Sequence, residues 1–283
     1  MSGLSTACRK QNRPGMTKPT TARPLNVLQL TDPHLMASAD GALLGVNTRD
    51  SLAAVIGEVL RNHGQPDLIL ATGDLTQDAS PEAYRYFGEQ LQAFDCPSLW
   101  IAGNHDDSAL LSAIAAETGS DQKQWIQGGW QFVMLDSSVH GKVFGELSAD
   151  ELSFLDRALS ERPELPAMVC LHHHPVDIGS DWMEKIGLKN RDAFWQVIDR
   201  HPQVRVVLWG HIHQELEQQR NGACLLATPS TCIQFATGSS DFAVEPLAPG
   251  YRWLELDPSG CFKTEVRRAA SFEFDLDEKS TGY

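Results

Sequence analysis

Five apolar, strand-like runs in this 283-residue chain each lead directly into side chains that commonly bind metal ions. Burying a carboxylate, imidazole or carboxamide costs several kcal/mol unless the group is paired or metal-bound. Five such endings in one chain therefore indicate a single site along one edge of a sheet. The seven side chains are Asp32 and His34 in LQLTDPH, Asp74 in LILATGD, Asn104 in LWIAGNHD, His172 in MVCLHHHP, and His211 and His213 in VVLWGHIH.

Strand-like and helical segments alternate along the chain, which predicts an α/β architecture with ligands beyond the carboxyl ends of the strands. The apolar runs are mostly continuous, as expected of strands covered on both faces. Helices are predicted over 48–64 (with Gly64 as its stop), from Ser80-Pro81, after the capping-box residue Ser148, and over 191–201. The predicted strands are Leu25–Leu30, Leu68–Ala71, Leu99–Ala102, Phe132–Leu135, Met168–Leu171, Val204–Trp209 and Cys224–Ala227.

The ends of the chain differ in composition from its centre. Residues 1–23 are basic and polar without an apolar core segment, so we expect a disordered leader and not a signal peptide. Residues 24–270 then form the domain, and the acidic tail 271–283 is expected to be frayed. Six scattered cysteines without a C-x-x-C pair indicate free thiols, and no run of 18 apolar residues occurs. We therefore expect a cytoplasmic protein with no membrane partner.

The charge and the donor types restrict the chemistry further. A net charge of −14 argues against a nucleic-acid partner, and a phosphate substrate would need bound cations to attract it. Asp32 and His34 lie two residues apart, so an extended chain would turn both to one face, and the H-x-H pair has the same spacing. Neutral nitrogen and anionic oxygen donors without cysteine suit Mn, Fe or Zn better than Ca or Mg. In the HHHP run, His172 directly follows the strand and is assigned to the metal; His173 and His174 could orient their neighbours.

The order D-x-H, G-D, G-N-H-D, H-H, G-H-x-H resembles that of the calcineurin-like metallophosphoesterases from Leu25 to His213. The stretches LLGVNT, ATGDLTQD, IAGNHD, LHHHP, GHIHQEL and LLATPSTCIQF resemble the bacterial class III 3′,5′-cyclic AMP phosphodiesterases and extend the similarity to Phe235. This resemblance implies an α/β sandwich of two packed mixed sheets flanked by helices. It also implies two divalent ions, Fe or Mn with Zn possible, that share Asp74. One ion would be held by Asp32, His34, Asp74 and His213, and the other by Asp74, Asn104, His172 and His211.

The implied reaction is hydrolysis of 3′,5′-cyclic AMP to 5′-AMP, which would lower intracellular cyclic AMP. Two cations about 3.5–4 Å apart can bind phosphate and generate hydroxide from a bridging water. His105, one residue from a ligand, is predicted to stabilise the transition state or to protonate the leaving oxygen; its alternative role is to orient Asn104. With Asp74 and His105 as the catalytic pair, the residues expected to contact substrate are His34, Asp74, Asn104, His105, His172 and His213.

The sequence is also compatible with other functions. The same centre could serve a phosphomonoesterase, a glycerophosphodiesterase or another nucleotide hydrolase, because a fold does not name its substrate. A non-catalytic scaffold should have lost ligands, and this chain retains all seven. Trp182 and Phe235 lie in plausible rims of a base pocket, but packing would explain them equally well. The sequence leaves the oligomeric state open.

Overall fold

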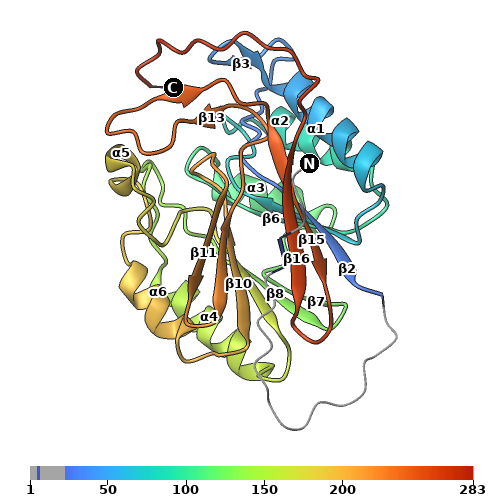
Figure 1. The fold of residues 1–283 in the computed structure, drawn as a ribbon, viewed down its shortest axis with the longest axis vertical. Helices are drawn as coiled ribbons and strands as arrows, with labels where there is room; N and C mark the ends of the chain where they lie inside the picture. The colour runs from blue at the N-terminus through green and yellow to red at the C-terminus, as the bar shows by residue number, and fades with distance from the viewer. Residues whose placement is uncertain (1–4, 7–22, 283) are drawn as a thin grey trace.

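Two six-stranded β-sheets pack face to face in the computed structural model, which describes residues 5–6 and 23–282 (Figure 1). Both sheets are mixed. In the first, the parallel strands lie toward one edge and the antiparallel strands toward the other, whereas in the second four parallel strands are flanked by an antiparallel strand at each edge. The first runs in the order β1 (Ser5–Thr6), β16 (Phe262–Arg268), β15 (Gly250–Leu256), β2 (Leu25–Leu30), β5 (Leu68–Thr72), β6 (Ser98–Ile101). The second runs in the order β11 (Leu216–Arg220), β12 (Ala223–Ala227), β10 (Val204–Trp209), β9 (Ala167–Cys170), β8 (Trp130–Met134), β7 (Gln124–Gln127).

Helices cover the outer faces of this sandwich. The first sheet packs against α1 (Thr48–Asn62), α2 (Pro81–Leu91) and α3 (Ser108–Ala116). The second packs against α4 (Ala149–Glu161) and α6 (Arg191–Ile198), and the short α5 (Asp181–Glu184) lies in the connection between β9 and α6. Two small ribbons complete the fold: β3 (Ala42–Leu43) with β4 (Val46–Asn47), and β13 (Gln234–Phe235) with β14 (Val244–Glu245).

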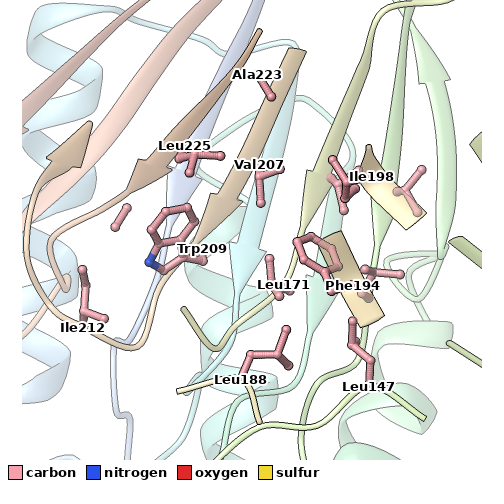
Figure 2. Packing of buried hydrophobic residues seen from close by; sticks show 14 of the residues in the cluster. Leu147, Leu171, Leu188, Phe194, Ile198, Val207, Trp209, Ile212, Ala223 and Leu225 are labelled. Carbon is pink, nitrogen blue, oxygen red and sulfur yellow. The ribbon is translucent and has the colours of Figure 1, made fainter. Parts of the chain in front are cut away.

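The central strands are buried on both faces, which explains their continuous apolar sequences. In β10, Val206 and Leu208 point into the core between the two sheets, whereas Val207 and Trp209 point outward into the core beneath the helices. Figure 2 shows Val207 and Trp209 in that outer core, with Phe194 of α6 among the residues that pack there. The predicted sandwich of two mixed sheets flanked by helices is therefore confirmed.

Most local predictions agree with the structure. Strands β2 and β10 have the predicted bounds, and the other predicted strands shift by one or two residues. The side chains of Ser80 and Ser148 cap α2 and α4, and Gly64 follows α1 with a φ of +77°. Helix α3 and the long antiparallel pair β15 and β16 were not predicted; β16 is mostly half-buried and lacks the continuous apolar run of the central strands.

The acidic tail differs from expectation. Phe272, Phe274 and Leu276 pack against the apolar cores, and the Asp277 N–H donates to the carbonyl of Leu44 at 2.9 Å. The expectation of fraying is therefore wrong for this stretch, because its alternating aromatic and aliphatic residues bury one side of the segment. The predicted disordered leader falls outside the described residues, apart from Arg23 and the short strand Ser5–Thr6. No helix in residues 5–6 and 23–282 is long and apolar enough to cross a membrane.

Candidate metal centre

The loops that follow β2 and β10 bring three of the predicted ligands together. Nε2 of His213 lies 3.3 Å from Oδ1 of Asp32 and 3.2 Å from Nε2 of His34. All three side chains are buried, although β2 and β10 belong to different sheets. This first group therefore lies where the two sheets meet, beyond the carboxyl ends of their central strands.

Asp74 lies between this group and a second one. Its Oδ2 is 3.8 Å from Nε2 of His34 and 3.2 Å from Nε2 of His172, and it makes no hydrogen bond among the described residues. Its Oδ1 accepts a hydrogen bond from the His105 N–H at 2.8 Å. A buried carboxylate oxygen without a hydrogen bond, flanked by two imidazoles, is placed as a ligand shared by two cations would be.

The second group contains Asn104, His172 and His211. Nε2 of His172 is 3.3 Å from Oδ1 of Asn104, and the rings of His172 and His211 have centroids 4.9 Å apart. The backbone N–H of His211 donates to both oxygens of Asp32 at 3.0 and 3.1 Å, which connects this group to the first. The other six predicted ligands are thus gathered around Asp74.

The spacing of the donor atoms fits metal coordination. Donors about 2.0–2.1 Å from one ion lie roughly 2.9–3.4 Å apart in octahedral or tetrahedral geometry. Donor atoms of residues predicted to share one ion lie 3.2 to 3.3 Å apart in four pairs: His34 with His213, His172 with Asp74, His213 with Asp32, and His172 with Asn104. Carboxylates, imidazoles and one carboxamide form a donor set that suits a borderline divalent metal. The residues present therefore fit a divalent ion on each side of Asp74.

Each candidate histidine ligand uses one ring nitrogen to bind the protein. Nδ1 of His34 faces Oε1 of Gln77 at 2.6 Å, and Nδ1 of His172 and of His213 face the carbonyls of Thr72 and Ile233 at 2.8 and 2.9 Å. His211 instead directs Nε2 to the carbonyl of Ile186 at 3.1 Å. Because this contact occupies one nitrogen of each ring, the nitrogen left to face a cation is Nε2 in His34, His172 and His213 and Nδ1 in His211.

The backbone at the ligands is not extended, which corrects the expectation for the D-x-H motif. Asp32 and His34 have φ values of 53° and 48°, and His211 and His213 have values of 65° and 50°. Asp74 also adopts this left-handed conformation, with a φ of 48°. Such angles are strained for non-glycine residues and persist only where the surroundings enforce them. In each pair, these turns direct the two side chains to the same side. The alternation of side chains along an extended strand is not the cause.

The other histidines of the HHHP run take different positions. His173 lies near His172 and His211, but its Nδ1 faces Ser137 Oγ at 2.8 Å and its Nε2 faces the Val143 carbonyl at 3.2 Å. With both nitrogens facing protein partners, His173 is poorly placed to bind a cation. The ring of His174 stacks against His211 with centroids 5.5 Å apart. These contacts support the choice of His172 as the ligand.

Burial and charge perturb the titration of the ligands. Burial lowers the pKa of His34 to about 3, so this imidazole is neutral and ready to bind a cation. Burial raises the pKa of Asp74, but the nearby His172 and His105 outweigh this effect and hold it well below its usual range. Burial lowers the pKa of His172, yet the carboxylate of Asp74 outweighs this and raises it to about 9. A metal ion at this position must therefore displace a proton from His172.

His105 differs in its exposure from the aspartates and histidines predicted as ligands, all of which are buried. It is partly exposed, and its ring meets that of His34 edge-on with centroids 5.0 Å apart. One nitrogen of His34, one of His105 and an oxygen of Asp74 lie within 4.8 Å of one another. His105 is thus beside the centre and partly accessible to solvent.

Asp106 is a supporting residue to which the sequence analysis gave no role. Its buried carboxylate accepts hydrogen bonds from the N–H groups of Leu75, Thr76 and Gly103 at 2.8–3.1 Å. It therefore ties the loop that carries Asp74 to the loop that carries Asn104. Its position next to the G-N-H run is the only sequence signal that could have suggested this function.

Comparison with known proteins places the chain in a family. Residues 25–215 match the calcineurin-like phosphoesterases. The chain belongs to this family. It is 45% identical over 267 residues to the 3′,5′-cyclic adenosine monophosphate phosphodiesterase CpdA of Pseudomonas aeruginosa, covering 94% of this chain and 97% of that protein. A protein of the same name from Escherichia coli (strain K12) is 44% identical over 92% of this chain and 95% of its own length.

Solved structures agree at the level of the fold. A dimetal phosphatase from Danio rerio superposes with a TM-score of 0.67 at 15% identity, covering 92% of this calcineurin-like phosphoesterase and all of that chain. The family predicted from the order of the five motifs is therefore confirmed.

Proposed function

We propose that this calcineurin-like phosphoesterase hydrolyses 3′,5′-cyclic AMP to 5′-AMP with two divalent metal ions, and so lowers the concentration of cyclic AMP in the cell. The observation that carries the proposal is the gathering of six other donor side chains around the buried carboxylate of Asp74. The choice of substrate is supported by relatives at 44–45% identity whose names specify 3′,5′-cyclic adenosine monophosphate.

The donor groups divide into two sets that share Asp74. Iron or manganese suits both sets, and zinc is a possible substitute, because all three accept imidazole and carboxylate donors. When bound, two such cations neutralise phosphate charge and lower the pKa of a water molecule, which supplies a nucleophile at neutral pH. The first ion would be held by Asp32, His34, Asp74 and His213, and the second by Asp74, Asn104, His172 and His211.

His105 is the group that we assign to the leaving oxygen. Hydrolysis breaks the bond between phosphorus and O3′ of the ribose, and phosphorus gains an oxygen from water. O3′ then needs a proton, which the partly exposed imidazole of His105 can donate. The hydrogen bond from its backbone N–H to Oδ1 of Asp74 holds the main chain of His105 at the edge of the centre.

The same residues would surround the bound phosphate. The phosphate of the substrate or product must lie against the open side of the centre, within reach of several ligand side chains. Because these ligands are buried and pinned through their second nitrogen, they would hold the phosphate in one orientation. The residues proposed to contact substrate are His34, Asp74, Asn104, His105, His172 and His213.

Action in the cytoplasm is part of the same proposal. Cys96, Cys170, Cys224 and Cys232 are free thiols, as expected in a reducing compartment.

The test is hydrolysis of a substrate panel with Mn²⁺ or Fe²⁺, repeated after chelation. The panel contains 3′,5′-cyclic AMP, 3′,5′-cyclic GMP, 2′,3′-cyclic AMP, a glycerophosphodiester and p-nitrophenyl phosphate. We expect metal-dependent hydrolysis with the highest kcat/KM for 3′,5′-cyclic AMP. A higher kcat/KM for the phosphomonoester would replace the substrate assignment, and full activity after exhaustive chelation would refute the metal assignment.

A further inference from the structure

The segment Pro229–Phe235, here called the brace loop, follows β12 and lies outside residues 25–215. Every residue in it is buried. A buried loop with so many backbone polar groups requires internal partners for them. Several of those partners are residues of the candidate metal centre, so the loop lies directly behind that centre.

The brace loop holds the backbone of the D-x-H motif. Ser230 Oγ donates to the carbonyl of Asp32 at 2.6 Å. The backbone N–H and the hydroxyl of Thr231 both donate to the carbonyl of Thr31, at 3.0 and 3.2 Å. These bonds restrain Asp32, which has a left-handed φ of 53°, and Thr31, which precedes it. A strained turn of this kind persists only where the surrounding structure restrains it.

The brace loop also holds the ring of His213. The Ile233 carbonyl accepts the hydrogen bond from Nδ1 of His213 at 2.9 Å. The Phe235 ring stacks on the imidazole with centroids 4.1 Å apart and planes inclined by only 6°. One contact fixes the tautomer and the other fixes the plane of the ring, so Nε2 can point in one direction only.

The loop is itself anchored to the rest of the domain. Ser51 Oγ of α1 donates to the Thr231 carbonyl at 2.7 Å, and the Gly250 N–H of β15 donates to the Ser230 carbonyl at 2.9 Å. The side chain of Gln234 closes the loop on itself by donating to the same Ser230 carbonyl at 2.8 Å. The brace loop therefore connects the predicted ligands Asp32 and His213 to α1 and to the first sheet through hydrogen bonds.

We infer that the brace loop sets the affinity of one of the two metal positions, the one formed by Asp32, His34, Asp74 and His213, and that Phe235 is its main positioning residue. The second position has its own supports in the carbonyls of Thr72 and Ile186. Loss of the Phe235 ring should thus weaken one ion and leave the other in place. This inference rests on the proposed dinuclear site. It also assigns Phe235, which is 1% exposed, to the support of His213 and not to stacking against a nucleobase.

The test is Mn²⁺ binding to the full chain after chelation, by calorimetry and by metal analysis after dialysis. Phe235→Leu should lower the affinity of one ion by about 10–100-fold, the usual effect of removing a support behind a metal ligand, with the other ion unchanged. Phe194→Leu is the matched control, because Phe194 is equally buried in the same apolar cluster (Figure 2) and its ring packs against that of Trp195, with centroids 4.9 Å apart. It should lose a similar amount of thermal stability and retain both affinities.

Ser230→Ala provides a second variant with almost no change in volume, in case Phe235→Leu does not fold. It should weaken the same ion by removing the hydrogen bond to the Asp32 carbonyl. Wild-type affinity for both ions in Phe235→Leu or Ser230→Ala, equal weakening of both ions, or the same loss in Phe194→Leu would refute the inference. Failure of the wild-type chain to bind two ions would instead refute the proposed function.

Discussion

Gly103 is a position where one added methyl group should disturb the candidate metal centre directly. A Cβ at this residue would lie 2.1 Å from Oδ1 of Asp74 and 2.4 Å from its backbone nitrogen. Cβ atoms essentially never approach other heavy atoms within 3.0 Å, so the Asp74 nitrogen must move by about 0.6 Å and Oδ1 by about 0.9 Å. Gly103 does not have a positive φ, so an alanine there is strained by this contact and not by its own backbone.

The displacement acts on the one carboxylate that both metal positions share. A misplacement of about 1 Å in a catalytic group lowers the rate by roughly 10²-fold. Overpacking of a buried site typically destabilises a protein by about 1–3 kcal/mol. We therefore expect Gly103→Ala to fold, to lose about 10²-fold in kcat for cyclic AMP, and to bind both ions more weakly.

The assay combines steady-state hydrolysis of cyclic AMP with Mn²⁺, metal content after dialysis, and thermal unfolding. Gly57→Ala is the matched control: Gly57 lies within α1, and the nearest atom to its added Cβ is Arg61 Nη1 at 3.3 Å. That change should leave kcat unaltered and stabilise the helix by about 0.5–1 kcal/mol. Wild-type kcat and tight binding of two ions in Gly103→Ala would show that the contact between the two loops does not position Asp74.

Three further changes test other parts of the argument. His105→Ala should retain both ions and lose about 10²–10⁴-fold in kcat, and an unchanged rate would remove His105 from the mechanism. Asp74→Ala should lose both ions in metal analysis, and two tightly bound ions would refute its shared position. Partial burial raises the pKa of Asp67, but hydrogen bonds from Arg23 and the Asn26 N–H outweigh it and hold the pKa below its usual value. The ionised Asp67 therefore stabilises the folded protein at neutral pH, and this stabilisation is lost as the pH falls through the folded-state pKa. In Asp67→Asn, the midpoint of urea unfolding should accordingly fall less between neutral and acid pH than in the wild type. An unchanged pH dependence would refute this expectation.

The central strands could be predicted because a strand that is buried on both faces has a continuous apolar sequence. In β10 the consecutive residues Val206, Val207, Leu208 and Trp209 supply two separate cores, so each of them must be apolar. The tail could not be predicted in the same way. Its acidic residues suggest solvent exposure, and only the tertiary contacts of Phe272 and Leu276 show that the segment is packed. Local composition indicates whether a segment can be buried, but not where it finds a surface to cover.

The side chains predicted as metal ligands could be picked out from the sequence and the groups that support them could not, for a chemical reason. Aspartate and histidine at the end of a buried strand are unusual, so their side-chain types carry information. The groups that fix the imidazoles of His172, His211 and His213 are backbone carbonyls, which every residue type has. The side chain of Ile233 can therefore change without any loss of its carbonyl, whereas a shift of its backbone would redirect the His213 ring. The support of the candidate metal centre therefore depends on the position of the backbone around it. The residues that fix that position, such as Ser230 and Phe235, are identified only by their contacts in the structure.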